Sequence, residues 1–262
     1  MKFSIVTPSL NQGGFIRDCI ESVRAQTGVD WEHIVIDAGS TDETISIVKE
    51  YPHLKWISEP DKGMSDGINK GFLKAQGEWL MWLNADDYLV PGSLAKVAEF
   101  AKKNADADVI YGECIFVDES KKVIRRRWEH GFDFSILLFY GCFIPSTSTF
   151  IQRKVIAAGE LLNIEYRVCM DFELYVRLSE HGYKFKFLPD ALACFRWHPT
   201  NTSTTQSKRR YQERLRVQQE YLRRHGKNWI AGEKTIFALW RLITIKRLVL
   251  RLVSRYFRRQ NV

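Results

Sequence analysis

Short apolar segments alternate with segments of helical periodicity over residues 2–117, and this alternation restricts the chain to few architectures. The apolar segments are residues 2–7, 33–36, 54–58, 79–83 and 108–117. The helical segments between them are residues 15–26, 43–50, 65–75 and 92–103. Because strands that alternate with helices pair through crossover connections, the pattern predicts an α/β fold, with a mostly parallel central sheet flanked by helices.

Acidic residues follow two of the predicted strands, where each strand ends. Asp37 follows residues 33–36, and Asp86 and Asp87 follow the aromatic-rich run 79–83. Ligands of open α/β sheets bind outside the carboxyl ends of the strands. Two adjacent carboxylates repel each other, and a hard divalent cation relieves that repulsion. The pattern predicts a metal and phosphate site at Asp86 and Asp87, with a loop or helix-capping acid pair as the structural alternative.

Polar and glycine-containing segments follow the first and third predicted strands. Residues 8–14 are typical of a ligand-contacting loop. Within residues 59–71, the helical spacing of Asp66, Asn69 and Lys70 places them on one face, which a solvated first turn also explains. The sequence contains neither a GxGxxG nor a GxxxxGK(S/T) loop, which argues against a standard NAD fold and a P-loop. These features favour a nucleotide whose diphosphate is held through a metal.

Four motifs, in order along the chain, carry a resemblance to a known family. They are residues 4–9 with Asn11, residues 36–42, residues 58–63 with 65–71, and residues 83–87. Together they resemble the family 2 glycosyltransferases of the GT-A fold, and among these the bacterial enzymes that build surface polysaccharides. The resemblance covers residues 4–87 and extends more loosely to about residue 200. One departure is visible, because Asn84 stands where many relatives have an aspartate.

The resemblance implies a role for each motif. Nucleotide-sugar binding falls to Thr7, Pro8, Ser9, Asn11, Asp37, Gly39, Ser40, Asp61, Lys62, Asp66, Asn69 and Asp86. A carboxylate accepts hydrogen bonds from the ring N–H of uracil or thymine, and a UDP-sugar is the favoured donor. The cofactor is Mn2+ or Mg2+, bound by Asp86, Asp87 and His198. Asp171 is the general base, with Glu173 as its substitute; the structural alternative is that Asp171 caps the N-terminus of a helix and Glu173 is a further acid of its first turn.

The rest of the second half is less specific. Residues 125–128 follow a predicted strand and are interpreted as a solvated edge, with phosphate contact as the alternative. Residues 132–145 are strongly apolar and predict either core or an acceptor-lining loop. Two further strands are predicted at residues 184–188 and 191–197, and Ser203 in the following loop is a candidate phosphate contact.

The tail is strongly basic. From residue 208 onward it holds sixteen Lys and Arg against three acids, within a chain of net charge +8. Helices are predicted at residues 208–224 and 235–259. In the second helix one side carries Leu242, Ile245, Val249, Leu252, Val253 and Tyr256, and the other Arg247, Arg251, Arg255, Arg258 and Arg259. Such a helix suits an anionic membrane surface, and a helix docked on the core with a solvated basic face is the alternative.

These observations predict a glycosyltransferase domain at residues 1–205 and a basic helical extension at 206–262. Within the domain, residues 1–117 form the nucleotide-sugar half and 118–205 the acceptor half. The expected reaction is inverting, metal-dependent transfer of a sugar to a hydroxyl of a glycan or lipid-linked acceptor in surface-polysaccharide synthesis. A nucleotidyltransferase and a non-catalytic nucleotide-sugar-binding module are the alternatives. An acidic cleft argues against nucleic acid.

The five scattered cysteines indicate a reducing compartment, and the sequence shows no signal-peptide pattern and no charge-free run of membrane-spanning length, so we expect a cytoplasmic protein. The basic amphipathic tail predicts peripheral attachment to the inner face of the membrane.

Overall fold

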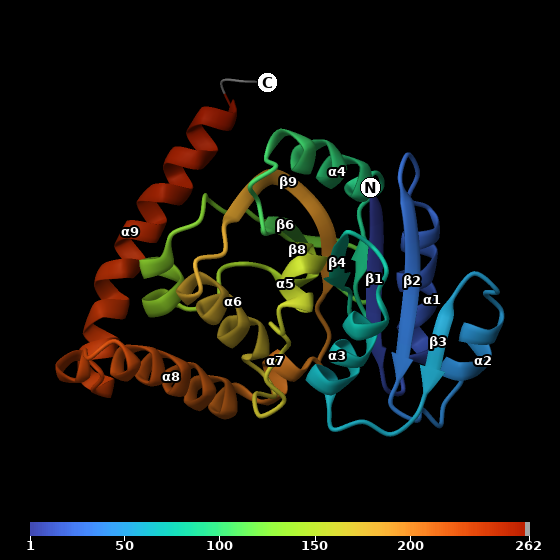
Figure 1. Ribbon diagram of the computed structural model, residues 1–262, viewed down its shortest axis with the longest axis horizontal. Coiled ribbons are helices and arrows are strands. Elements are labelled where there is room, and N and C mark those ends of the chain that lie inside the picture. Colours follow the sequence, from blue (N-terminus) through green and yellow to red (C-terminus); the bar gives the residue numbers. More distant parts are fainter. Residues whose placement is uncertain (260–262) are drawn as a thin grey trace.

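One nine-stranded mixed sheet organises the protein (Figure 1). The computed structural model describes residues 1–259, except for the side chains of residues 202–203 and 256–259. Along the sheet the strands follow the order β3-β2-β1-β4-β8-β6-β9-β5, and β7 pairs with β6 outside this path. Helices cover both faces of the sheet, and two long helices wrap the side opposite the β3 edge (Figure 1).

The first half of the chain forms the parallel part of the sheet. Its strands are β1 (Lys2–Ser9), β2 (Asp30–Asp37), β3 (Lys55–Ser58) and β4 (Trp79–Trp82), and its helices are α1 (Gly13–Arg24), α2 (Thr44–Lys49), α3 (Met64–Lys74) and α4 (Ser93–Lys103). Alternate residues of β1 and β4 enter different cores, since successive side chains of a strand point to opposite faces. Val6 and Trp82 pack with α3, whereas Ile5 and Met81 pack with α1 and α4. Burial on both faces explains why these strands are continuous apolar runs.

The second half of the sheet is mixed. Its strands are β5 (Tyr88–Leu89), β6 (Val109–Val117), β7 (Val123–Arg127), β8 (Thr149–Gln152) and β9 (Phe185–Arg196). β8 runs antiparallel to both β4 and β6, whereas β9 runs parallel to β6. The predicted α/β fold is confirmed, and its parallel pairing is concentrated in the first half.

Residues 185–196 form one strand, β9, where the sequence predicted two, at residues 184–188 and 191–197. Pro189 interrupts the apolar pattern, but β9 continues past it through an irregularity in its pairing with β6. Tyr111 pairs with Phe187, and two residues later Glu113 pairs with Ala191. The extra residues of β9 accommodate the proline, which cannot donate a hydrogen bond to a neighbouring strand.

The remaining helices belong to the second half and the tail. They are the π-helix η1 (Ile136–Tyr140), the 3-10 helices η2 (Ser146–Ser148) and η3 (Asn228–Ile230), and the α-helices α5 (Arg153–Ala157), α6 (Met170–Glu180), α7 (Thr202–Thr205), α8 (Ser207–Arg224) and α9 (Glu233–Arg259). Both predicted tail helices are present as α8 and α9. No helix within residues 1–259 is long and apolar enough to cross a bilayer.

Helix α9 docks on the core through its basic side, contrary to the arrangement with a solvated basic face. Arg247 is buried and donates to both carboxylate oxygens of the fully buried Glu129, at 3.0 and 2.8 Å. Arg251 donates to the carbonyl oxygen of Trp128, and Lys246 pairs with Asp133. The apolar side of α9 faces solvent instead, where, besides Phe237, six large aliphatic side chains are between 45% and 66% exposed. They are Leu242, Ile245, Leu248, Val249, Leu252 and Val253.

Candidate active site

The parallel strands bring their polar ends to one edge of the sheet. Ser9 pairs with Asp37, and Asp37 pairs with Ser58, so the last residues of β1, β2 and β3 are in register. The turn after β4 joins this edge, because Leu83 donates its N–H to the carbonyl oxygen of Val6. The acids that the sequence placed after β2 and β4 therefore lie at the same edge of the sheet.

Asp37 organises the loop that follows β2. Its Oδ2 accepts the N–H groups of Gly39 (3.0 Å) and Ser40 (2.9 Å) and the hydroxyl of Ser58 (2.6 Å), and its Oδ1 accepts the Ser40 hydroxyl. The side chain is fully buried. Asn11, with φ of 51°, links this loop to the loop after β1, since its Oδ1 accepts the N–H of Thr41 at 2.9 Å. Asp37 thus gives the predicted nucleotide loop its shape.

Two predicted ligand contacts near the end of β1, Thr7 and Ser9, differ in their surroundings. Thr7 is fully buried and its Oγ1 lies 2.8 Å from Nε2 of His33, so its side chain belongs to the core. Ser9 Oγ is also buried but has no hydrogen-bond partner within the described structure. A buried hydroxyl without a partner is costly unless a ligand or water supplies one. Ser9 is therefore the better placed of the two for a ligand contact.

The segment before α3 is shaped by its own acids. Asp61 accepts the N–H of Gly63 at 2.7 Å, and Asp66 accepts that of Lys62 at 3.0 Å. A Cβ atom at Gly67 would lie 3.0 Å from Asp61 Oδ2, so glycine allows Asp61 to approach the helix. Asn69 connects α3 to the second half of the chain, because its amide exchanges two hydrogen bonds with the backbone of Leu162, at 2.8 and 2.9 Å.

Asp86 is the carboxylate at this edge that faces His198. Asp86 Oδ2 lies 2.9 Å from His198 Nε2 and accepts Asn201 Nδ2 at 3.3 Å, whereas Oδ1 accepts no hydrogen bond from a described residue. His198 is 5% exposed, its Nδ1 lies 2.8 Å from Thr200 Oγ1, and its ring stacks on Phe15. The sequence brought Asp86 and His198 into one predicted site, and the structure places them in contact.

Asp87 points away from His198 and into the sheet. It is fully buried, its Oδ1 accepts the N–H of Arg196 at 2.9 Å, and its Oδ2 accepts Asn84 Nδ2 at 3.2 Å. Burial, and then the neighbouring charge of Asp86, raise the pKa of Asp87 well above its usual range. Asn84 supplies a donor where an aspartate would add a third negative charge. In this conformation Asp87 fixes the turn, whereas Asp86 presents its carboxylate to His198.

The donor atoms of this site fit a cation with an incomplete protein shell. Within residues 1–259 no group of three or more His, Cys, Asp or Glu side chains is arranged around a common centre. Asp86 Oδ2 and His198 Nε2 face each other as one oxygen and one nitrogen donor. The carboxylate oxygen suits both Mn2+ and Mg2+, whereas the imidazole nitrogen does not suit the oxygen-binding Mg2+; diphosphate oxygens and water would supply the remaining ligands. The predicted metal site therefore fits Asp86 and His198, and Asp87 supports it from behind.

Asp171 begins helix α6 and lines a cavity of about 640 Å³. Its Oδ1 accepts the N–H of Phe172 at 2.7 Å, and Cys142 Sγ donates to its Oδ2 at 3.5 Å. Burial raises the pKa of Asp171 above its ordinary value, against the opposing effect of these hydrogen bonds. A carboxylate with a raised pKa is a better proton acceptor at neutral pH. Glu173 instead binds Arg177 through both oxygens, at 2.8 and 3.2 Å, and serves as a structural ion pair.

Glu213 of α8 fixes the segment that precedes Asp171. Its carboxylate accepts the backbone N–H groups of Arg167 (3.0 Å), Val168 (2.9 Å) and Cys169 (2.9 Å). Burial acts to raise the pKa of Glu213, but these hydrogen bonds outweigh it and the pKa lies below the usual value. On the other side, Ser65 of α3 donates to the carbonyl oxygen of Tyr166. The position of Asp171 thus depends on both α3 and the tail.

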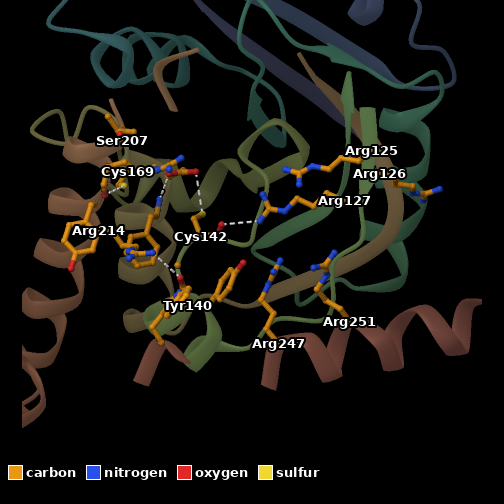
Figure 2. Close-up of a pocket in the computed structure, with 17 residues that line it drawn as sticks. Arg125, Arg126, Arg127, Tyr140, Cys142, Cys169, Ser207, Arg214, Arg247 and Arg251 are labelled. Carbon is orange, nitrogen blue, oxygen red and sulfur yellow. Dashed lines mark hydrogen bonds between the residues drawn. The ribbon is translucent and has the colours of Figure 1, made fainter. Parts of the chain in front are cut away.

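The cavity beside Asp171 is formed by several parts of the second half and the tail (Figure 2). Residues 140–142 at the end of η1 and residues 125–127 of β7 line it together with side chains of α8 and α9. The apolar segment 132–145 is therefore both core and cavity lining, since Ile136 and Leu137 are fully buried. The solvated-edge interpretation holds for Arg125 and Arg126, which are exposed, but Arg127 is partly buried and pairs with Glu129.

Sequence reasoning missed Asn201 and Glu213. Asn201 follows His198 closely, and its amide contacts both Asp86 and His198. A polar residue three positions after a candidate ligand was the available signal. Glu213 is one of three acids in the tail, and an isolated acid in a basic segment was its signal. The side chain of Ser203, a predicted phosphate contact, lies outside the described residues.

Several proteins of known family are similar in sequence to this chain. The profile of "Glycosyl transferase family 2" matches residues 4–164. A PGL/p-HBAD biosynthesis glycosyltransferase of Mycobacterium bovis (strain BCG / Pasteur 1173P2) is 34% identical over 181 residues, which cover 67% of this chain and 68% of that protein. The chondroitin synthase of Escherichia coli is 25% identical over 230 residues, covering 85% of this chain and 33% of that protein.

Solved structures share the fold at low sequence identity. S. aureus TarS 1-349 in complex with UDP-GlcNAc superposes with a TM-score of 0.68 at 16% identity, over 99% of this chain and 92% of that chain. The mannosyltransferase PcManGT from Pyrobaculum calidifontis, in complex with GDP-Man and Mn2+, gives a TM-score of 0.66 at 16% identity, over 97% and 73% of the two chains. The predicted glycosyltransferase fold is confirmed.

Proposed function

Since the chain belongs to glycosyl transferase family 2 and is a glycosyltransferase, we propose that it transfers a sugar, with inversion, from a nucleotide-diphosphate sugar to a hydroxyl of a glycan or lipid-linked acceptor. The contact between Asp86 and His198 at the carboxyl edge of the sheet carries this proposal. We place the reaction in cell-surface polysaccharide synthesis, in which lipid-linked acceptors are available.

The donor binds across the ends of β1, β2 and β4. The unpartnered hydroxyl of Ser9 and the loop built on Asp37 receive the nucleoside, with UDP as the favoured nucleotide. Neighbours in complex with UDP-GlcNAc and with GDP-Man support a nucleotide-sugar donor. Asp86 and His198 hold Mn2+ or Mg2+, and the neighbour with Mn2+ supports a divalent cofactor. When bound, the cation supplies positive charge to the diphosphate leaving group.

Asp171 removes the proton from the acceptor hydroxyl as the oxygen attacks the anomeric carbon. The carbon–oxygen bond to the diphosphate breaks as the new glycosidic bond forms, and the anomeric configuration inverts. Asp171 lines the cavity and has a raised pKa, and both features support this role. Glu173 is instead held in an ion pair with Arg177. Glu213, Ser65 and Asn69 hold the segment that carries the base.

The test is binding of UDP, GDP, dTDP and CDP, with and without Mn2+, to wild type and Asp86→Ala. We expect one nucleotide to bind in a metal-dependent way and the variant to lose that dependence. Asp171→Asn should bind the same nucleotide unchanged and lose transfer by about 10²-fold or more, as removal of a general base does. If no nucleotide binds wild type under any condition, the proposed donor site is wrong.

The released product separates the two alternatives. A glycosyltransferase releases a nucleoside diphosphate from the sugar nucleotide, whereas a nucleotidyltransferase releases pyrophosphate from a nucleoside triphosphate. A non-catalytic module binds the nucleotide but releases neither product. We expect release of nucleoside diphosphate alone.

We also propose that the protein is cytoplasmic and attaches to the inner face of the membrane through α9. Because the basic side of α9 is docked on the core, the contact is made by its exposed apolar stripe, with the basic tail attracted to anionic lipids. The double variant Leu248→Gln/Leu252→Gln should bind phosphatidylglycerol vesicles more weakly than wild type. Leu73→Gln, at an even more exposed leucine of α3, is the control. Equal binding by all three proteins would overturn the attachment.

A further inference from the structure

The cavity that holds Asp171 is unusually rich in arginine. Residues 125–127 of β7, Arg210 and Arg214 of α8, and Arg247 and Arg251 of α9 contribute seven guanidinium groups to its lining. Asp171 is the single acid among the lining residues. In Figure 2, Arg125 and Arg127 point into the cavity from β7, and Arg247 and Arg251 reach it from α9.

Nearby carboxylates neutralise only part of this charge. Glu129 pairs with Arg127 and Arg247, and Glu113 pairs with Arg126. Asp190 also lies 4.0 Å from Arg126, and Glu113, Glu129, Asp171 and Asp190 together are still fewer than the seven arginines. A neutral acceptor sugar would gain nothing from such a surface, whereas an anionic one would be attracted to it.

Some of these arginines have N–H groups that make no hydrogen bond to a described residue. Arg214 contacts the carbonyl oxygen of Tyr140 at 3.5 Å, and Arg251 donates through Nε to Trp128. Neither pairs with a carboxylate among the residues that the structure describes. The buried Nε atoms of Arg214 and Arg247 also lack a hydrogen-bond partner there, and Arg247 as a whole is only 5% exposed. Guanidinium groups with unused donors match the oxygens of phosphate in two-pronged hydrogen bonds.

We propose that this cavity binds a phosphate or diphosphate group of the acceptor, beside the hydroxyl that Asp171 deprotonates. The inference rests on the proposed glycosyl transfer and names the class of acceptor. A diphosphate carries more than one negative charge and matches the excess of arginine, whereas the carboxylate of an acidic sugar carries one. A volume of about 640 Å³ accommodates such a group together with a sugar.

Helix α9 indicates that this phosphate belongs to a membrane lipid. Arg247 and Arg251 line the cavity, while Leu248 and Leu252, one position along from each, are more than half exposed on the stripe that faces away from it. A single helix thus presents cations to the head of the acceptor and an apolar surface to the bilayer. A lipid phosphate at the membrane interface satisfies both sides of the helix.

The experiment measures binding of inorganic pyrophosphate, and of farnesyl diphosphate in phosphatidylcholine vesicles, to the full chain with UDP and Mn2+ saturating the donor site. We compare wild type with Arg214→Gln/Arg251→Gln. Arg24→Gln, an exposed arginine of α1 that pairs with Glu21, is the matched control. We expect the double variant to bind both ligands about tenfold or more weakly, since charge-assisted hydrogen bonds are lost, and the control to bind as wild type does.

The outcomes separate the inference from the function on which it rests. Equal affinity of wild type and the double variant for pyrophosphate, with UDP binding intact, overturns the phosphate site and leaves the glycosyltransferase proposal standing. Absence of UDP binding in wild type removes both. If farnesyl diphosphate binds no tighter than pyrophosphate, the lipid origin of the phosphate is wrong. Leu248→Gln/Leu252→Gln should weaken only the vesicle-borne ligand.

Discussion

Replacing Glu213 with alanine removes the acceptor of three backbone N–H groups in front of Asp171. A donor left unsatisfied in the interior costs about 1–3 kcal/mol, and water relieves the cost where it can enter. Cys169 is buried, Val168 partly so, and Arg167 exposed, so the full cost applies to Cys169 and a smaller one to the other two. We expect Glu213→Ala to lower the free energy of unfolding by about 2–5 kcal/mol.

The same change should displace the base. A shift of about 1 Å in a catalytic group costs up to about 10²-fold in rate, so kcat should fall by that order. UDP affinity should stay at the wild-type value, because Glu213 contacts none of the predicted donor residues.

Urea unfolding, steady-state kinetics and UDP titration measure the three quantities. Glu99→Ala, which removes an exposed ion pair with Lys103 on α4, should change none of them. If Glu213→Ala unfolds at the wild-type urea concentration and keeps its kcat, Glu213 does not hold the base in place.

Two further predictions concern buried polar groups of the donor half. Asn84→Asp replaces the hydrogen bond to Asp87 with a like charge and should lower the free energy of unfolding by about 1–3 kcal/mol at neutral pH. This loss should shrink as pH falls, because repulsion between the carboxylates at positions 84 and 87 raises their pKa in the folded protein, which then binds more protons than the unfolded chain. Urea unfolding at several pH values without metal tests this expectation. A loss that does not depend on pH would contradict it. Burial lowers the pKa of His33 to about 3, so only the unfolded chain gains this proton between pH 6.5 and about 3. As pH falls through that window, the free energy of unfolding should therefore decrease by about 1.4 kcal/mol per pH unit. Urea unfolding of His33→Gln should show a pH dependence that lacks this contribution.

Much of the fold could be predicted because burial on both faces gives the parallel strands continuous apolar runs. The runs that became β1, β2 and β4 were recognised for this reason, as were the acids that follow β2 and β4. Short or exposed elements lack that signal. β5 is two residues long, and β7 exposes most of its side chains at the edge of the sheet. Pro189 had the opposite effect, since it divided one strand into two apparent ones.

The site was predicted by residue type better than by contact. Asp86 and His198 are 112 positions apart, and only the pairing of β9 with β6 and β5 brings His198 to the edge of the sheet. The inward turn of Thr7 and the two hydrogen bonds of Asn69 to Leu162 depend on which neighbour each side chain meets. Such contacts leave no periodic pattern in a sequence. The orientation of α9 could not be predicted either, because the pattern of an amphipathic helix does not determine which of its sides packs against the protein.

The grip of Glu213 on residues 167–169 also sets a time at which the enzyme becomes active. A chain is synthesised from its N-terminus, and domains begin to fold as they emerge from the ribosome. The strands of the donor half are complete well before residue 213 is added, so a growing chain has its nucleotide loops before the base is held in position. Under the mechanism that we propose, sugar transfer begins only after α8 has joined the core, because a shorter chain lacks the carboxylate that fixes the segment before the base.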